Sequence, residues 1–273
     1  MFAVPGNREP AKRGGGESIV ECRRTPHRIR EVSLVAGSTR LRMFPLNTVL
    51  FPGAGLNLHI FEPRYRQLVA ECLDAKEAFG VVLIREGDEA GDPDVEPHFV
   101  GTTAEIADVT PLPSGRYYLS STGGRRFRIS QIVSREPYLL CEVEYLEETP
   151  GDPETIERLT AEIAVEFREY LSLIVEFAGS ASEVTIPEDP VRASYAIGEA
   201  LQVADALKQQ LLELGSAEER LDAELGFLRR LLPQLRSLLQ RKKEREPPES
   251  TAAPGGGFRT HQEKFFGKHF SNN

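Results

Sequence analysis

The sequence is poor in the residues that build disulfide, metal and redox sites. It has three cysteines in 273 residues and no tryptophan. Cys22, Cys72 and Cys141 are odd in number and far apart, which is not the pattern of a disulfide framework. Cys72 and Cys141 fall on apolar faces of their segments. This position predicts buried, reduced thiols and a cytoplasmic protein.

Long hydrophobic runs are also missing. No apolar stretch approaches the roughly 20 residues that a membrane-spanning helix needs. The first residues contain no apolar segment of the kind found at the centre of signal peptides. The sequence therefore predicts a cytoplasmic protein without a membrane partner.

Positive charge is scarce in the central part of the chain. Residues 43–240 hold 17 lysines and arginines against 34 aspartates and glutamates, a net charge of −17. Residues 1–42 and 241–273 carry net charges of +5 and +3. Because an acidic surface repels nucleic acid, we do not expect nucleic acid to bind the central part.

The two ends of the sequence lack a sustained apolar period. Residues 1–40 contain a triple glycine and several prolines, which predicts a disordered basic arm. Residues 244–273 return to proline, glycine and charge, which predicts a disordered tail. Four phenylalanines of this tail leave open a second interpretation, a short linear motif: Phe258, Phe265, Phe266 and Phe270.

The sequence also lacks motifs for catalysis and for metal or cofactor binding. It has no glycine-rich phosphate loop that ends in Gly-Lys-Ser/Thr. The five histidines are scattered, without a Cys-x-x-Cys or His-x-x-x-His pair. Asp92, Asp94 and Glu96 alternate in a loop, but Pro97 takes the position of the glycine that an EF-hand needs. We expect no catalytic residues, no metal and no cofactor.

What the sequence does contain, over residues 41–148, is the pattern of short strands. Leu56 to Ile60 alternates apolar and polar residues, and Phe79 to Ile84 is a continuous apolar run typical of a strand buried on both faces. Turn residues recur about every ten positions. Pro63 and the apolar spacing after it predict one helix among these strands. The pattern predicts a small, closed or nearly closed β structure.

From residue 149 the apolar period changes to three and four residues, which is typical of helices. Asp152–Pro153 and Asp189–Pro190 have the residues of helix starts, and Ser216 to Glu219 has the residues of a capping box. The second helix is expected to run from Pro190 to Leu214. Three amphipathic helices with short connections predict a helical bundle over residues 149–243.

Several of these segments resemble a known family. The runs FPLNTVLFPG and LHIFEPRYRQLV are similar to the start of the LON substrate-binding domain, the N-terminal module of ATP-dependent Lon protease. FGVVLIREGDE, VGTTAEIADV, GRYYLSSTGGRRFRI and YLLCEVEYLEE match it further along, in the same order. The resemblance covers about residues 41–240. It implies an α+β fold, a PUA-like β pseudo-barrel with one packed helix followed by a C-terminal α-helical bundle.

The resemblance also implies a function in protein quality control. We expect a free-standing, non-catalytic module without the ATPase and peptidase domains of Lon. It would bind unfolded or client polypeptide, or a partner in a protease complex, in a groove between the barrel and the helices. The predicted peptide-binding residues fall in the family's first-helix motif: Phe61, Arg64, Tyr65 and Arg66.

Other interpretations, structural and functional, compete with this assignment. Arg64 and Arg66 could form ion pairs within the acidic body, and Glu62 could cap the helix that begins at Pro63. Arg125, Arg126 and Arg128, near two tyrosines, leave open an RNA- or small-molecule-binding regulator built on a PUA-like barrel. Pairing of these arginines with Glu142 or Glu144 across strands is the structural alternative to RNA contact.

Overall fold

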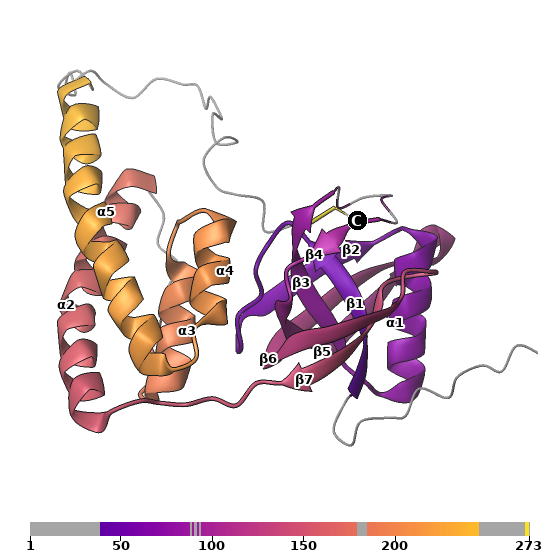
Figure 1. Cartoon of the computed structure of the whole chain (residues 1–273). Helices are drawn as coiled ribbons and strands as arrows, with labels where there is room; N and C mark the ends of the chain where they lie inside the picture. The colour runs from indigo at the N-terminus through magenta and orange to yellow at the C-terminus, as the bar shows by residue number, and fades with distance from the viewer. Residues whose placement is uncertain are drawn as a thin grey trace, which may run out of the picture. The chain divides into compact units, whose positions relative to one another are not determined.

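The computed structural model describes residues 39–87, 89, 92, 94–178, 185–245 and 271–272. We name its two main parts the strand region, residues 39–148, and the helical region, residues 149–245 (Figure 1). The predicted disordered arm at 1–40 and tail at 244–273 lie almost entirely outside the described residues. The predicted boundaries of the parts between them, 41–148 and 149–243, stay a prediction.

The strands of the strand region pair into a ring of neighbours. β1 pairs in parallel with β3 and antiparallel with β7. β6 pairs antiparallel with β7 and β5, and β5 pairs antiparallel with β3, which returns to β1. β6 also pairs antiparallel with β2. The described elements of this region are β1 (Thr39–Leu46), β2 (Gly55–Ile60), α1 (Pro63–Ala75), β3 (Phe79–Glu86), β4 (Glu96–Pro97), β5 (Val100–Leu112), a 3-10 turn (Pro113–Gly115), β6 (Arg116–Ser134) and β7 (Leu140–Tyr145).

Helix α1 covers part of this region with one apolar stripe. Pro63 occupies its first turn, as predicted, where the missing N–H of proline costs no hydrogen bond. Tyr65 stacks on Phe44 of β1 with ring centroids 4.0 Å apart. Strand β3 is buried from Phe79 to Leu83, which confirms the prediction of a strand covered on both faces.

The predicted capping role of Glu62 is wrong. Glu62 occupies the N-cap position of α1, but its side chain accepts no hydrogen bond from the backbone of the first turn. Its Oε2 instead pairs with Nε of Arg64 at 2.8 Å. A guanidinium two residues away competes for the carboxylate, because charge-assisted bonds are stronger than bonds to a neutral N–H.

The two cysteines of the strand region are free and buried, as predicted. Burial raises the pKa of Cys72 to about 11 and that of Cys141 to about 12, because a thiolate is poorly solvated in an apolar interior. Both side chains therefore act as small apolar core residues.

The helical region consists of helices whose starts follow the sequence signals. Asp152 Oδ2 accepts the N–H of Thr155 at 2.9 Å. At the start of α5 the capping box is complete, with Ser216 Oγ accepting the N–H of Glu219 and Glu219 Oε2 accepting the N–H of Ser216, both at 3.1 Å. The described helices are α2 (Pro153–Ala178), α3 (Pro190–Ala200), α4 (Asp205–Glu213) and α5 (Ala217–Arg245).

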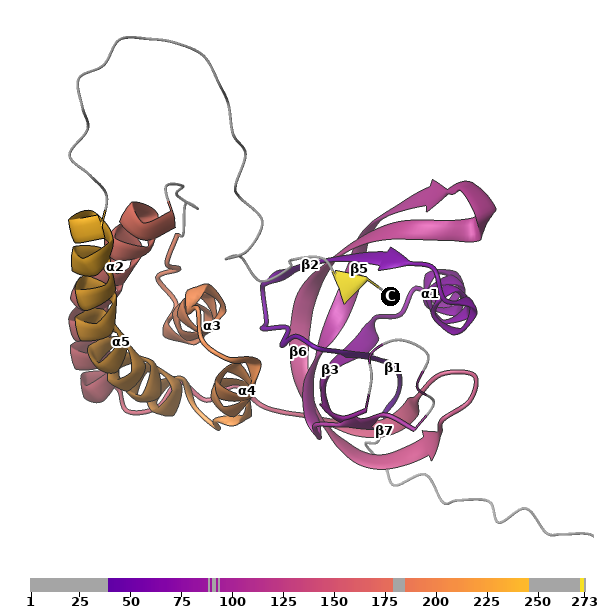
Figure 2. The same ribbon diagram turned by 90° about the horizontal axis from the view of Figure 1, so that it is seen from above.

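Helices α2 and α5 lie side by side (Figure 2). They run in the same direction, because the residue numbers of their ion pairs rise together on both helices. Their ion pairs step along both helices by seven residues. This spacing is the heptad of helices that share one seam. The pairs are Glu162–Arg229, Glu169–Arg236 and Glu176–Lys243.

The single helix expected from Pro190 to Leu214 is wrong. α3 ends at Ala200, Leu201 takes an extended conformation (φ −66°, ψ 125°), and α4 begins at Asp205. The N–H of Gln202, freed by the break, donates to the hydroxyl of Tyr170 at 2.8 Å. The apolar residues keep their helical spacing across the break, so the spacing alone did not predict that the helix ends at Ala200. The hydroxyl that accepts the freed N–H comes from another helix.

The strand and helical regions share one apolar core. Val49, Phe51, Leu83 and Val100 of the strand region belong to the same buried cluster as the inner side chains of α2 to α5. The predicted combination of strands and helices, α+β, is confirmed. In the part of the chain that the structure describes, no helix combines the length and apolar character that crossing a membrane requires.

Candidate functional site

A cleft of about 1010 Å³ opens where the helical region meets the strand region. Its strand-region wall comes from the loop Pro52–Ala54, from residues 124–126 of β6 and from residues 146–148 after β7. Its helical wall comes from α2 and α3, together with Thr185 and Pro187 just before α3. The volume is in the range of clefts that bind small molecules and short peptide segments.

A glycine of β6 sets the position of the strand-region wall. Gly123 and the loop exchange two backbone hydrogen bonds of 2.8 Å, from Gly53 N–H to Gly123 O and from Gly123 N–H to Ala54 O. A Cβ at Gly123 would lie 2.1 Å from the carbonyl oxygen of Phe51. Only glycine allows this approach, which directs Phe51 into the shared core and leaves Pro52 to Ala54 on the cleft.

The helical wall is mainly apolar because α2 turns one stripe of side chains toward the cleft. Leu171, Ile174 and Val175 follow at helical spacing, and Val191 of α3 adds to the same wall. Val175 is 37% exposed. An apolar wall with solvent-exposed side chains can bind an apolar partner by removing its own surface and that of the partner from water.

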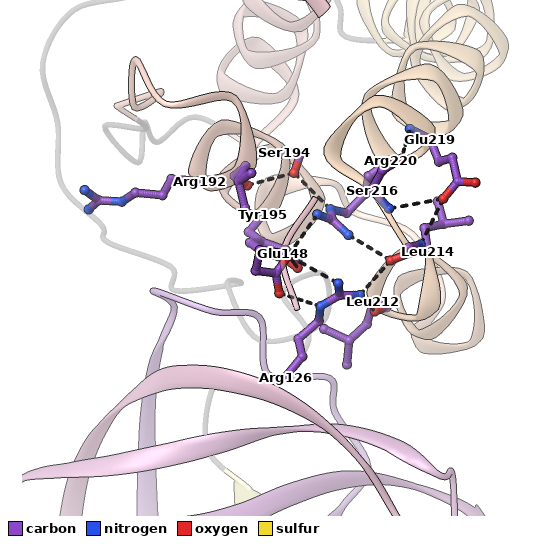
Figure 3. Close-up of polar contacts among 12 residues, drawn as sticks. Arg126, Glu148, Arg192, Ser194, Tyr195, Leu212, Leu214, Ser216, Glu219 and Arg220 are labelled. Carbon is purple, nitrogen blue, oxygen red and sulfur yellow. Dashed lines mark hydrogen bonds and ion pairs between the residues drawn. The ribbon is translucent and has the colours of Figure 1, made fainter. Parts of the chain in front are cut away.

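The strand-region side of the cleft is anchored by a buried arginine (Figure 3). Arg126 of β6 is 1% exposed and its Nε donates to Glu148 Oε1 at 2.8 Å. Its Nη1 donates to the carbonyl oxygens of Leu212 and Leu214, both at 2.6 Å. These carbonyls lie at the end of α4, where a cation is favoured by the helix dipole. Arg126 therefore joins β6 to the helical region.

A second buried arginine completes this cluster from the helical side. Arg220 of α5 donates from Nε to Ser194 Oγ at 2.9 Å and from Nη1 to Leu214 O at 3.2 Å. Its guanidinium lies 3.9 Å from the ring centroid of Tyr195. The Tyr195 hydroxyl donates to Glu148 Oε2 at 2.6 Å, and burial raises the pKa of Tyr195 above its ordinary value. Glu148 thus accepts bonds from both sides of the cleft.

The rim of the cleft carries charges of both signs. Arg125 stacks over the ring of Tyr145 at 4.1 Å from the centroid. Arg192 is exposed, and its side chain points away from the Glu148 cluster (Figure 3). Glu199 Oε2 is buried, and no described residue donates a hydrogen bond to it. The rim therefore offers cations and a carboxylate acceptor around an apolar wall.

No reactive group stands out in this arrangement. Glu148 accepts hydrogen bonds from Arg126 and from the Tyr195 hydroxyl, and it forms an ion pair with Arg220 at 3.7 Å. Within residues 39–245 as far as they are described, no group of three or more His, Cys, Asp and Glu could hold a metal ion. The apolar wall and the charged rim of the cleft are suited to binding a ligand.

The four residues predicted from the sequence lie at the start of α1 and do not line the cleft. Phe61 is 38% exposed, beside His59. Arg64 pairs with Glu62 and donates to the carbonyl of Asp92 at 3.0 Å. Tyr65 is buried, and burial raises its pKa to about 12. Their peptide-binding role stays a prediction, in which Phe61 supplies the exposed apolar area.

Arg66 lies against the turn before β6. A Cβ at Gly115 would lie 2.2 Å from Nη2 of Arg66, so the guanidinium covers the backbone of this turn. Gly115 has a φ of 69°, a conformation that side chains disfavour. Glycine therefore meets two requirements here, the left-handed backbone and the space that Arg66 occupies.

The strand register places one of the three β6 arginines opposite its expected partner, and an ion pair between the two stays a prediction. Arg128 lies directly opposite Glu144 in the pairing of β6 and β7. Arg126 pairs instead with Glu148, and Arg125 stacks on Tyr145.

Sequence reasoning predicted a groove between the strands and the helices, but not the residues that line it or its buried cluster. Arg126 and Leu212 are 86 positions apart, so no local pattern connects them. Glu148 lies in the connection between the two regions, and its partners Arg126 and Tyr195 are 22 and 47 positions away. The one available signal was Arg220, which follows the spacing of the buried leucines of α5 rather than that of its exposed face.

Comparison with known proteins assigns the chain to a family. Residues 40–230 match the model of the ATP-dependent protease La (LON) substrate-binding domain. The chain is 28% identical over 209 residues to "Lon protease 2" of Syntrophobacter fumaroxidans, with 76% of this chain and 26% of that protein covered. It is 26% identical over 227 residues to "Lon protease" of Anaeromyxobacter dehalogenans, with 82% and 27% covered. The chain spans about a quarter of the length of these relatives.

Two solved structures have a related fold. The Lon N-terminal domain protein from Xanthomonas campestris has a TM-score of 0.53 and 28% identity, covering 69% of this chain and 98% of that one. The N-terminal domain of Mycobacterium avium complex Lon protease has a TM-score of 0.51 and 22% identity, covering 70% and 98%; at this identity the likeness supports the fold alone. Since the family model spans most of the described strands and helices, the chain belongs to the family of LON substrate-binding domains.

Proposed function

We propose that the chain is a non-catalytic module that binds extended segments of other polypeptides in the cleft between α2, α3 and the strand region. The observation that carries this proposal is the exposed apolar wall of α2 in a cleft of about 1010 Å³. The bound segment would be one that a folded protein keeps inside, as in unfolded or damaged clients. The family's description as a substrate-binding domain supports the same class of ligand.

The chemistry of the cleft fits an extended peptide with apolar side chains. Leu171, Ile174 and Val175 would cover those side chains, and their burial would supply most of the affinity. Glu199 would accept a backbone N–H of the peptide, and Arg192 would donate to a backbone carbonyl. Rim charges of both signs would set orientation more than affinity.

The buried cluster would keep the cleft open without a ligand. Arg126 donates to Glu148 and to the carbonyl of Leu214, while Arg220 donates to the same carbonyl and forms an ion pair with Glu148. These bonds hold the strand-region wall at a fixed distance from α3 and α5. A preformed cleft binds more tightly than one that must be ordered on binding, because less conformational entropy is lost.

Finer features of the fold also belong to this proposal. We infer that the ring of β1, β3, β5, β6 and β7 is the PUA-like barrel implied by the family resemblance, and that α2 to α5 form the bundle. ATP hydrolysis and peptide cleavage would reside outside this module, because the printed sequence contains no Gly-Lys-Ser/Thr phosphate loop. A protease complex in the cytoplasm would be the natural acceptor of its clients.

Two valines of α2 give a matched test. Val175 lines the cleft, whereas Val165 of the same helix is 64% exposed and lies outside it. Val175→Glu should weaken binding of a fluorescently labelled, permanently unfolded polypeptide by about tenfold, because a charge would face the apolar segment. Val165→Glu should change it less than twofold. Anisotropy titrations measure both, and circular dichroism checks that both variants fold.

Equal affinities of the two variants would remove the cleft from the binding site. The same titrations with RNA at physiological salt test the alternative, a nucleic-acid-binding regulator. Saturable RNA binding after deletion of residues 1–40 and 246–273 would favour that alternative. The engagement of Arg126 with Glu148 and of Arg125 with Tyr145 speaks against it.

A further inference from the structure

The strands at the two edges of the sheet differ in how well they are protected against pairing with another strand. β4, at one end, has two residues, Glu96 and Pro97. A short strand with a charge and a proline is a poor template for another strand, because proline has no N–H to donate. β2, near the other end, has the six residues GLNLHI, without a charged residue or a proline. The outer edge of β2 therefore lacks the features that prevent strand addition.

A short segment of this chain pairs with that edge. β8 (Ser271–Asn272) lies beside β2 and pairs with it in parallel (Figure 2). Leu58 lies opposite Ser271, and His59 lies opposite Asn272. The other edge of β2 is paired with β6 from Gly55 to Ile60. β8 thus occupies the one side of β2 that the sheet leaves open.

Three aromatic side chains lie together at the end of β2. His59 lies opposite Tyr118 of β6, with ring centroids 5.0 Å apart, and 5.8 Å from Phe61. Tyr118 is 50% exposed and Phe61 is 38% exposed. We call His59, Phe61 and Tyr118 the aromatic patch. It offers a partially exposed apolar surface next to the open strand edge.

We propose that the outer edge of β2, with the aromatic patch, is a strand-addition site whose occupant is the segment 258–273 of this chain. Backbone hydrogen bonds to β2 would hold the segment, and the patch would contact its apolar side chains. The sequence of this segment, FRTHQEKFFGKHFSNN, contains four phenylalanines and more lysine and arginine than glutamate. Its positive charge is complementary to the net charge of −17 on residues 43–240.

This site is separate from the cleft. The loop Pro52–Ala54 lines the cleft, but no residue of β2 does. Occupation of the β2 edge by the chain's own segment would protect it from pairing with a second chain. It would also cover Phe61, which the sequence predicts as a peptide contact. Strand addition by another polypeptide at this edge would then require release of the segment.

Hydrogen exchange on the full chain and on a chain that ends at Glu246 tests the proposal. Deletion should speed exchange of the β2 amides by about tenfold, the equivalent of one lost hydrogen bond, and leave β7 amides unchanged. A synthetic peptide of residues 258–273 should restore the protection. Unchanged exchange at β2 after deletion would overturn the proposal. Protection that rises with protein concentration would overturn it as well, by assigning the edge to a second copy.

Two peptide variants separate backbone pairing from simple charge attraction. A peptide with Ser271→Ala and Asn272→Ala keeps both backbone N–H groups and should bind the shortened chain like the natural peptide. A peptide with Ser271→Pro and Asn272→Pro keeps the same charge but cannot donate from either position, and should bind at least tenfold more weakly. Equal binding of the two variants would rule out strand addition.

The aromatic patch has its own matched pair. Tyr118→Ser should weaken binding of the peptide several-fold, whereas Phe99→Ser, at a 51% exposed phenylalanine outside the patch, should not. Equal effects would remove the patch from the site. Val175→Glu should leave peptide binding at β2 unchanged, so failure of the cleft proposal and failure of this one give different results.

Discussion

The start of α1 and the cleft differ in what their side chains already contact. At α1, the predicted residues are largely engaged by their own chain: Arg64 with Glu62, and Tyr65 with Phe44. In the cleft, charges are paired at the base while apolar side chains of α2 stay accessible. A family motif can therefore contain residues that contact their own chain, while the surface that we propose for binding is built from residues far apart in sequence.

The largest expected effect concerns the base of the cleft. Arg126→Met should lower the free energy of unfolding by about 3–5 kcal/mol, because two helix-end carbonyls would lose their buried donor and Glu148 would lose its 2.8 Å partner. Urea denaturation measures the loss. Arg128→Met, on an exposed position of the same strand, is the control and should stay within about 0.5 kcal/mol. Similar losses in both variants would show that the cluster does not join the two regions.

A smaller but still large loss is expected at α1. Tyr65→Ala should lower the free energy of unfolding by about 3 kcal/mol, because the buried ring packs against Phe44 and leaves a cavity when removed. Phe61→Ala, at an exposed ring four residues earlier, should cost less than about 1 kcal/mol. The comparison would fail if Tyr65→Ala left stability unchanged and abolished polypeptide binding, since Tyr65 would then be a contact residue.

Replacing a buried carboxyl of α5 should raise the stability of the folded protein, unlike the substitutions above. Burial raises the pKa of Glu224 well above its ordinary value, so the folded protein keeps the proton that the unfolded chain loses near pH 4. Stability is therefore lost as pH rises from that point toward the raised pKa. Glu224→Gln removes this dependence and should be more stable than the natural chain at pH 7, and equal to it at pH 3.5. Unfolding by urea at both values measures the difference, and equal stabilities at pH 7 would contradict the raised pKa.

The smallest effect is expected on the outer surface of α2 and α5. Arg236 pairs with Glu169 through two hydrogen bonds of 2.6 and 2.7 Å, but the arginine is 55% exposed. Arg236→Ala should cost about 0.5 kcal/mol in low salt, and the cost should vanish in 1 M salt because exposed pairs are screened. A loss above about 2 kcal/mol would place this pair among the main links between the helices.

The sequence was sufficient for features that depend on neighbours along the chain. Helix starts at Asp152 and Ser216, the buried strand at Phe79 and the apolar stripe of α1 all follow from local patterns. It was not sufficient for the break between α3 and α4, because the hydroxyl of Tyr170 that satisfies the freed N–H comes from α2. The base of the cleft could not be predicted for the same reason, since most of its bonds join segments far apart in sequence.

Site-specific photo-crosslinking tests the proposed cleft most directly. A photoreactive amino acid placed at residue 175 should crosslink to an unfolded polypeptide, and the same group at residue 165 of the same helix should not. A third position, residue 61, reports on the start of α1. Crosslinks from 175 well above those from 165 and 61 are the predicted result. Crosslinks from residue 61 with none from 175 would move the binding site to α1 and contradict the cleft.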